Sequence, residues 1–202
     1  MTEESEVGEY RGIGLDDQFI PAVLEHLEQW LRQHSRASAE LAEKLARELG
    51  LADSDIRVLR VAALLHEMEK LDVPPGEYGD ARLTEAEEAL LRRSPAVLGR
   101  LVSEGELGRI LDAVVSWREH FDGSGRGGVT GDEIPLLARI LSVACAFLHL
   151  TMERPGHGPL NREAGAERLG GEAGTRHDPR VVGALQTLFG ERSEGGEKDE
   201  AV

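Results

Sequence analysis

Apolar residues recur at helical spacing through most of this chain, and this periodicity limits its fold more than any other feature of the sequence. One apolar stripe covers residues 19–31, and a second covers 41–49 and stops at Gly50. A third helix is predicted over about 54–70, around a nearly unbroken apolar run. No segment shows the alternation of apolar and polar residues that is typical of a half-buried strand.

Helix signals continue through the second half of the chain, separated by two loops. The first loop, residues 71–82, is rich in Pro and Gly, and the second, residues 121–131, holds five glycines. The predicted helices begin at Thr84, with Glu87 completing a capping box, at Ser94-Pro95, around the apolar stripe 107–115, at Pro135 (running through Met152) and at Asp178-Pro179. We therefore predict an all-α fold, a bundle of short helices.

The two ends of the chain differ in composition from its middle. Residues 1–17 and 191–202 are rich in Glu and Gly and show no periodicity, so we predict mobile acidic tails there. Residues 18–190, which include the first amphipathic helix, are predicted to form a single helical domain.

The charge balance is strongly acidic, and this excludes one class of partner. Lys and Arg total 23 against 38 for Asp and Glu, which gives a net charge of −15 and a pI of about 4.9. Duplex nucleic acid binds to basic faces, so we expect no such partner. The longest mainly apolar stretch, residues 140–150, is too short to span a bilayer, and no signal peptide is evident. We expect a cytoplasmic protein without a membrane partner.

His66 and Glu67 end the central apolar run, and Lys70 follows one turn later. A carboxylate in such a position is costly to bury unless it is paired. One interpretation is that His66 and Glu67 bind a metal while Lys70 faces a substrate phosphate. The other is an ion pair between Glu67 and Lys70 beside a hydrogen-bonded histidine. Because Cys145 is the single cysteine, any metal must be held mainly by His and carboxylate groups.

From His34 to Phe189, about three quarters of its length, the chain resembles the HD-GYP family, the branch of the HD phosphohydrolases that hydrolyses cyclic di-GMP. The resemblance implies an HD-domain helical bundle and a bacterial signalling context. The matching segments follow the family order and lie at 34–51 (HSRASAELAEKLARELGL), 61–74 (VAALLHEMEKLDVP), 83–99, 119–125 (EHFDGSG), 131–144, 153–155 and 173–182.

The resemblance also implies roles for individual residues. His34 matches the first histidine of the family's metal set, and His66 matches the His of its His-Asp pair. Glu67 stands where that pair has Asp, and Cys145 stands where the last ligand Asp is expected. Lys70 matches the lysine that closes the motif and is the candidate catalytic residue.

Several other family positions are changed in this chain. The changes are Glu69 for a glycine, Ser94 for a histidine, Trp117-Arg118 for a double histidine, Trp30 where some members have a glutamate, Gly125-Arg126-Gly127 for the GYP signature and Gly156-His157 for an Arg and Tyr region. With four candidate ligands left, the chain cannot hold the paired metals of the family but could hold one ion. The expected cofactor is therefore none, or one divalent metal ion.

Each of the substituted residues also has a plain structural interpretation. Cys145 is a small apolar filler in that case, and Ser94 caps a helix. Trp117 then packs in the core while Arg118 points to solvent; alternatively, Arg118 pairs with Glu67 or attracts a phosphate. The glycine loop that holds Arg126 is either a tight connector or a cradle for an anion.

Three functions follow from these alternatives. Loss of ligands favours a catalytically impaired signalling or interaction module, a pseudoenzyme that binds a protein partner or a ligand. The alternative is a single-metal HD phosphohydrolase or cyclic di-GMP phosphodiesterase that uses His34, His66, Glu67 and Cys145. A variant of the first is a cyclic dinucleotide receptor whose arginines, Arg92, Arg93, Arg118 and Arg126, bind the ligand. The first amphipathic helix either forms a homodimer contact or packs within the monomer.

Overall fold

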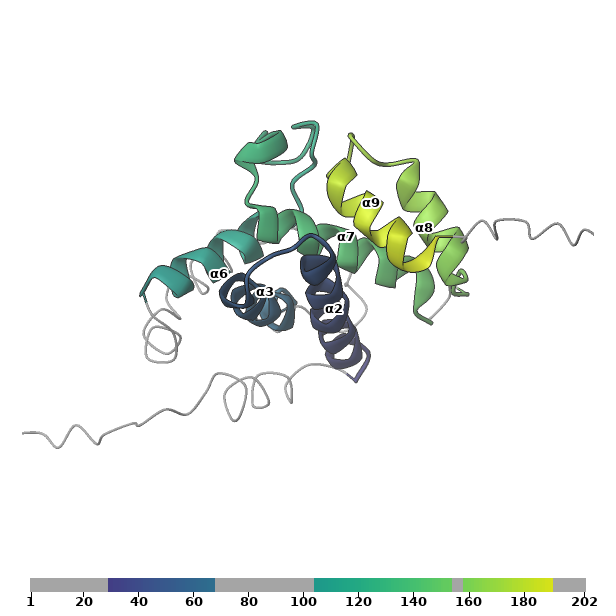
Figure 1. Cartoon of the computed structure of the whole chain (residues 1–202), viewed down its shortest axis with the longest axis horizontal. Coiled ribbons are helices and arrows are strands. Elements are labelled where there is room, and N and C mark those ends of the chain that lie inside the picture. Colours follow the sequence, from purple (N-terminus) through teal and green to yellow (C-terminus); the bar gives the residue numbers. More distant parts are fainter. Residues whose placement is uncertain (1–28, 68–103, 154–157, 191–202) are drawn as a thin grey trace, which may run out of the picture.

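The computed structural model describes residues 29–67, 104–153 and 158–190, and the elements in these ranges are helices joined by loops (Figure 1). The part of the chain that it describes contains no strand, only an isolated bridge between Ala173 and His177. The all-α prediction is confirmed. The helices are α2 (Gln29–Glu48), α3 (Asp53–Leu65), α6 (Glu104–Ser116), α7 (Leu136–Thr151), α8 (Arg162–Gly170) and α9 (Pro179–Phe189), with a 3-10 turn, η2, at Gly131–Glu133.

The first described helix corrects the predicted boundary between two helices. Stripes over 19–31 and 41–49 suggested separate helices, whereas α2 runs unbroken from Gln29 to Glu48. No Gly or Pro interrupts this stretch, so nothing in the sequence stops the helix there. The predicted stop at Gly50 is confirmed, since this glycine has a φ of 74°, a conformation that other residues rarely adopt.

Helix α7 lies at the centre of the fold, as Figure 1 shows, and packs against α2, α3, α6, α8 and α9. Its position follows from its sequence, LLARILSVACAFLHLT, which is apolar almost all round. The predicted start at Pro135 is confirmed, and the helix ends at Thr151, with Met152 as its cap. The residues buried along it include Cys145.

Helix α3 packs beside α2, and its C-terminal end positions His66 and Glu67. The buried apolar run ends at Leu65, after which His66 caps the helix and Glu67 follows in a turn. The helix predicted over 54–70 is therefore shorter than expected within the described range. Residues 68–70, the loop 71–82 and the helices expected from Thr84 and Ser94 lie outside the described residues.

Of the two C-terminal helices, α9 was predicted from the sequence and α8 was not. Helix α9 begins as predicted, with the Asp178 side chain accepting a hydrogen bond from the Arg180 backbone N–H. Helix α8 was not predicted, because its buried side is made of small residues and one leucine, Gly165, Ala166 and Leu169, which form no clear apolar stripe. Its signal was the N-cap: Asn161 accepts a hydrogen bond from the Ala164 N–H.

A buried ion cluster joins α7 to α9 and to η2. Arg139 on α7 donates to Asp178 at 2.6 Å and to Asp132 at 2.7 Å, and the side chains of Arg139 and Asp178 are 8% and 0% exposed. Arg180 also donates to both aspartates. Burial would raise the pKa of Asp178, but its hydrogen bonds and the charges of Arg180 and Arg139 hold that pKa below its usual value.

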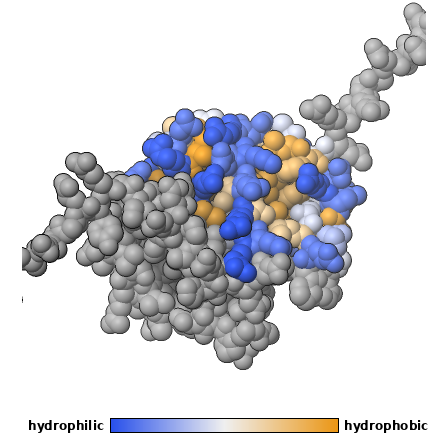
Figure 2. Space-filling view, turned by 90° about the horizontal axis from the view of Figure 1, so that it is seen from below, coloured by the Kyte–Doolittle hydropathy of each residue, from blue (hydrophilic) through white to orange (hydrophobic). Residues whose placement is uncertain are grey.

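The surface carries few large exposed apolar side chains among the described residues, namely Val115 and Leu160. In the view from below, hydrophilic side chains surround a smaller apolar area at the right of the described surface (Figure 2). Within residues 29–67, 104–153 and 158–190, no helix is long and apolar enough to cross a membrane. The predicted tails, 1–17 and 191–202, and the side chain of Trp30 lie outside what the structure describes.

We expect the Arg139 cluster to stabilise the fold measurably. Replacing Arg139 with Met keeps the apolar stem but leaves Asp178 buried with one cation fewer, and this should lower the free energy of unfolding by about 3 kcal/mol. The matched control is Arg168→Met, whose ion pair with Glu172 is exposed, and it should cost less than about 1 kcal/mol. Urea denaturation measures both, and equal losses would contradict the buried role of Arg139.

We also expect stability to fall as the pH is lowered through the range in which His177 titrates. Burial lowers the pKa of His177 from 6.5 to about 4, although Glu172 raises it in part. Between these values the unfolded chain binds a proton that the folded chain does not, so the free energy of unfolding decreases as pH falls, by up to about 3 kcal/mol at pH 4. Denaturation from pH 7 to 4.5 should show a shallower slope for His177→Gln, and an unchanged slope would refute the assignment.

Candidate metal centre

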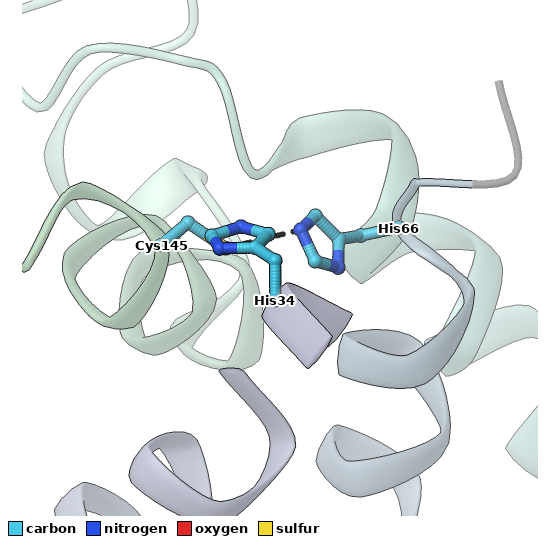
Figure 3. A group of neighbouring side chains, drawn as sticks. All are labelled: His34, His66 and Cys145. Carbon is cyan, nitrogen blue, oxygen red and sulfur yellow. Dashed lines mark hydrogen bonds between the residues drawn. The ribbon is translucent and has the colours of Figure 1, made fainter. Parts of the chain in front are cut away.

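Three elements that are distant in the sequence bring polar side chains into one buried place. Figure 3 shows His34 from α2, His66 from the end of α3 and Cys145 from α7 pointing toward one another. One donor atom from each lies within 4.8 Å of the other two, and all three residues are buried. Two nitrogens and a sulfur at this spacing are suited to share a metal ion.

The His66 ring is held in one orientation by the backbone. Its Nδ1 lies 2.6 Å from the carbonyl oxygen of Ala63. Because a carbonyl oxygen only accepts, Nδ1 carries a proton and donates it there, and Nε2 faces the cluster, 3.3 Å from the sulfur of Cys145. A hydrogen bond from the far nitrogen to a carbonyl is the usual way in which proteins orient a histidine ligand.

Glu67 brings a carboxylate to the same point. Its Oε1 lies 3.4 Å from His66 Nε2 and 3.7 Å from His34 Nε2, and its side chain is 0% exposed. Ser38, one turn after His34 on α2, links the cluster further: its hydroxyl is 3.5 Å from His34 Nε2 and 3.7 Å from the Cys145 sulfur. The structure therefore brings together all four candidate ligands. One comes from α2, one from α7 and two from the end of α3.

The electrostatics of the cluster are dominated by its negative groups. Burial lowers the pKa of His66, but charge and hydrogen bonding from Cys145 and Glu67 outweigh this effect and raise the pKa to about 10. His66 is therefore cationic in the protein alone, and its Nε2 must lose a proton before it can ligate a metal. An ion of charge +2 would take over the role of that proton beside the Glu67 carboxylate.

A fifth donor, His149, was missed by sequence reasoning. It lies one turn after Cys145 on α7, so the two share a helix face. A donor atom of His149 lies within 4.8 Å of donors on His34 and Glu67. The available signal was the spacing of Cys145 and His149, i and i+4 on one predicted helix, which is a common arrangement of metal ligands.

Trp117 and Arg118, at the position of the family's double histidine, form a wall of the cluster. Trp117 is buried, and its ring stands edge-on to the His66 ring at a centroid distance of 5.1 Å. The Arg118 guanidinium lies over the Trp117 ring, 4.6 Å from its centre. Trp117 thus packs, as one interpretation of the sequence held, and the guanidinium of Arg118 covers its ring.

The glycine loop that contains Arg126 is built around a carboxylate of its own. The Gly127 N–H donates to Glu119 Oε1 at 2.8 Å. A Cβ on Gly125 would come within 2.6 Å of the His120 backbone nitrogen, so only glycine fits there, whereas a Cβ on Gly127 would displace the Glu119 carboxylate from 2.8 Å. This geometry supports the interpretation of the loop as a tight connector, from which Arg126 projects as an exposed side chain.

Other sequence predictions about the site fall on residues that the structure does not describe. They concern Lys70 as a catalytic residue, Glu69, Ser94, the Arg92 and Arg93 pair and the 156–157 segment, and they stay predictions.

Comparison with known proteins agrees with this geometry. The sequence model of the family described as "HD domain" matches residues 19–181. The chain belongs to the HD domain family. This match, together with relatives that are cyclic di-GMP phosphodiesterases and an HDG"Y"P protein of the same fold, confirms the HD-GYP-like phosphohydrolase resemblance seen in the sequence. HD phosphohydrolases use divalent metals.

Curated relatives of this HD domain are cyclic dinucleotide phosphodiesterases. The cyclic di-GMP phosphodiesterase response regulator RpfG of Xanthomonas campestris pv. campestris is 35% identical over 153 residues, which cover 73% of this chain and 40% of that protein. The 3'3'-cGAMP-specific phosphodiesterase 3 of Vibrio cholerae is 32% identical over 160 residues, 76% of this chain and 34% of that protein. The chain spans less than half the length of either relative.

Solved structures agree on the fold of the HD domain. An HDG"Y"P protein from Bdellovibrio bacteriovorus superposes with a TM-score of 0.56 at 20% identity, over 85% of this chain and 56% of that one. The crystal structure of a cyclic GMP-AMP phosphodiesterase of V. cholerae gives a TM-score of 0.57 at 18% identity, over 84% and 46% of the two chains. These likenesses establish the helical architecture.

We expect the wall formed by Trp117 to contribute strongly to stability. Trp117→Ala removes a large buried ring beside His66 and should lower the free energy of unfolding by about 3 to 5 kcal/mol. Trp117→Phe preserves an aromatic ring in the same place and should lose less than half as much. Chemical denaturation of both variants checks this, and an Ala variant as stable as the Phe variant would show that the ring does not pack as described.

Proposed function

We propose that this HD domain is a metal-dependent phosphohydrolase that hydrolyses a phosphodiester bond of a cyclic dinucleotide and uses one divalent ion. The observation that carries the proposal is the convergence of His34, His66, Glu67 and Cys145 from three separate elements. If Cys145 only filled space in the core, there would be no reason to bury two histidines and a carboxylate beside it. Burying such polar groups is costly unless they have a common partner.

The residues present fit one metal ion. His34, His66 and Cys145 offer two imidazoles and a thiolate, a suitable donor set for a divalent ion such as Zn²⁺, and the Glu67 carboxylate lies beside them. The backbone hydrogen bond that turns His66 Nε2 toward the cluster supports the same role. A bound ion would polarise a phosphoryl oxygen and make water acidic enough to supply the nucleophile near neutral pH.

The protein's own groups prepare the site for an anionic substrate. The overall charge of −15 opposes a phosphate at long range. Close to the site this repulsion is offset by Arg118, whose guanidinium is positioned by the Trp117 ring. Lys70, four residues after His66, is proposed to contact the same phosphate.

The proposed substrate class rests on the relatives. The relatives that share 35% and 32% of their aligned residues with this chain act on cyclic di-GMP and 3'3'-cGAMP, as their names state. Both are cyclic dinucleotides with two phosphodiester groups, so Arg118 has an anionic partner in either. The catalytically impaired module stays a prediction, and the same assay decides between the two functions.

The decisive assay offers cyclic di-GMP and 3'3'-cGAMP to the full chain with Mn²⁺, Fe²⁺ or Zn²⁺ and separates the products by chromatography. We expect metal-dependent formation of a linear dinucleotide, reduced by about 100-fold or more in His66→Ala, because even loss of an outer-shell partner of a metal site costs about 10- to 100-fold. His120→Ala, a histidine outside the cluster, is the matched control and should retain activity. Intact substrate with every metal would contradict the proposal and favour the non-catalytic module.

A further inference from the structure

His149 lies outside every position that the resemblance assigns to a metal ligand, yet it reaches the same cluster. Its ring lies parallel to that of His34, with a centroid separation of 4.6 Å and an angle of 1° between the ring planes, so one ring must turn for both to ligate the same ion. One donor atom each from His34, Glu67 and His149 lie within 4.8 Å of one another. These three residues form a second donor triad that overlaps the triad of His34, His66 and Cys145.

The two triads differ in chemistry. His34, His66 and Cys145 include a thiolate, a soft ligand that favours Zn²⁺. His34, Glu67 and His149 comprise two imidazoles and a carboxylate, a set without sulfur that suits Mn²⁺ or Fe²⁺. The change from Asp to Cys at position 145 inferred from the resemblance therefore makes one triad softer, whereas the other combines the Glu67 carboxylate with two imidazoles and has no sulfur.

The triads also share a residue, and this limits how many ions they can hold. A neutral imidazole has one nitrogen lone pair available for a metal, because its other nitrogen carries a proton. His34 can therefore ligate a single ion at a time. If both triads need His34, occupation of one excludes full occupation of the other.

We propose that His149 is a metal ligand and that the cluster holds one divalent ion in either of two overlapping positions. Zn²⁺ takes the position made by His34, His66 and Cys145, whereas Mn²⁺ takes the position made by His34, Glu67 and His149. This inference deepens the proposed function and rests on its metal site. It adds a ligand and a metal selectivity that follow from this chain's own residues.

The five donors differ in burial. His34, Glu67, His66 and Cys145 are 0 to 1% exposed, while His149 is half-buried. His149 is thus the most exposed of the five donors. An ion held by three protein ligands there keeps open coordination positions, as catalytic sites require.

The test measures metal binding by the full chain without any substrate. Protein freed of metal with a chelator is titrated with Mn²⁺, and electron paramagnetic resonance follows the loss of the free Mn²⁺ signal. Zn²⁺ is then added, and its affinity is measured against a chromophoric chelator. The variants are His149→Ala, His149→Gln and Cys145→Ala, with His120→Ala as the control histidine and circular dichroism as the check on folding.

The wild-type chain should bind one Mn²⁺, and one equivalent of Zn²⁺ should release it. Both His149 variants should bind Mn²⁺ at least about tenfold more weakly, with Zn²⁺ affinity nearly unchanged, and Cys145→Ala should show the reverse pattern. His120→Ala should match the wild type. Agreement between His149→Gln, which preserves the size of the side chain, and His149→Ala would exclude a purely steric effect.

Two results would overturn the inference: unchanged Mn²⁺ affinity in the His149 variants, or simultaneous retention of Mn²⁺ and Zn²⁺ by the wild type. Its failure is distinguishable from that of the proposed function. Turnover of a cyclic dinucleotide with unchanged Mn²⁺ binding in the His149 variants would reject the inference alone. The predicted metal pattern without turnover would reject the function alone, and a chain that binds neither metal would reject both.

Discussion

Burial of a charged and polar cluster inside an apolar helical core is the constraint on which the site depends. His34, His66, Glu67 and Cys145 are almost entirely removed from water, and isolated charges in such a place would be strongly destabilising. The arrangement lets these groups offset one another: the cationic His66 lies within 3.4 Å of both the Cys145 sulfur and a Glu67 oxygen. A divalent ion would satisfy the same electrostatic requirement and would replace a proton in doing so.

The rest of the fold holds the elements that supply the cluster. Helix α7 contributes Cys145 and His149 and is packed on several sides by other helices. Its first turn is joined to α9 and η2 through Arg139, whose two aspartate partners are both in contact with Arg180. Because α7 is fixed at this end and buried along its length, its two donors face α2 and the end of α3 in a defined register.

Among the described helices, the sequence predicted those with a clear apolar stripe and missed α8, whose buried side forms no such stripe although Asn161 caps its start. The Pro135 start of α7 and the Asp178 cap of α9 could be read directly, since the groups that end a helix are close in sequence to the backbone groups they satisfy. The continuity of α2 was not predicted, because it depends on the absence of a helix-breaking Gly or Pro. Helix α8 was not predicted, because the residues it buries are mostly small. For the site, the resemblance brought His34, His66, Glu67 and Cys145 together as candidates. His149 required three-dimensional packing, since its partners His34 and Glu67 are more than 80 residues away in the chain.

The central claim is that one metal ion binds among these buried donors, and X-ray absorption spectroscopy of the zinc-loaded chain tests it most directly. The account predicts one sulfur neighbour at about 2.3 Å together with imidazole scattering from two histidines. A zinc environment without sulfur, or with the scattering expected of a hydrated surface ion, would contradict it.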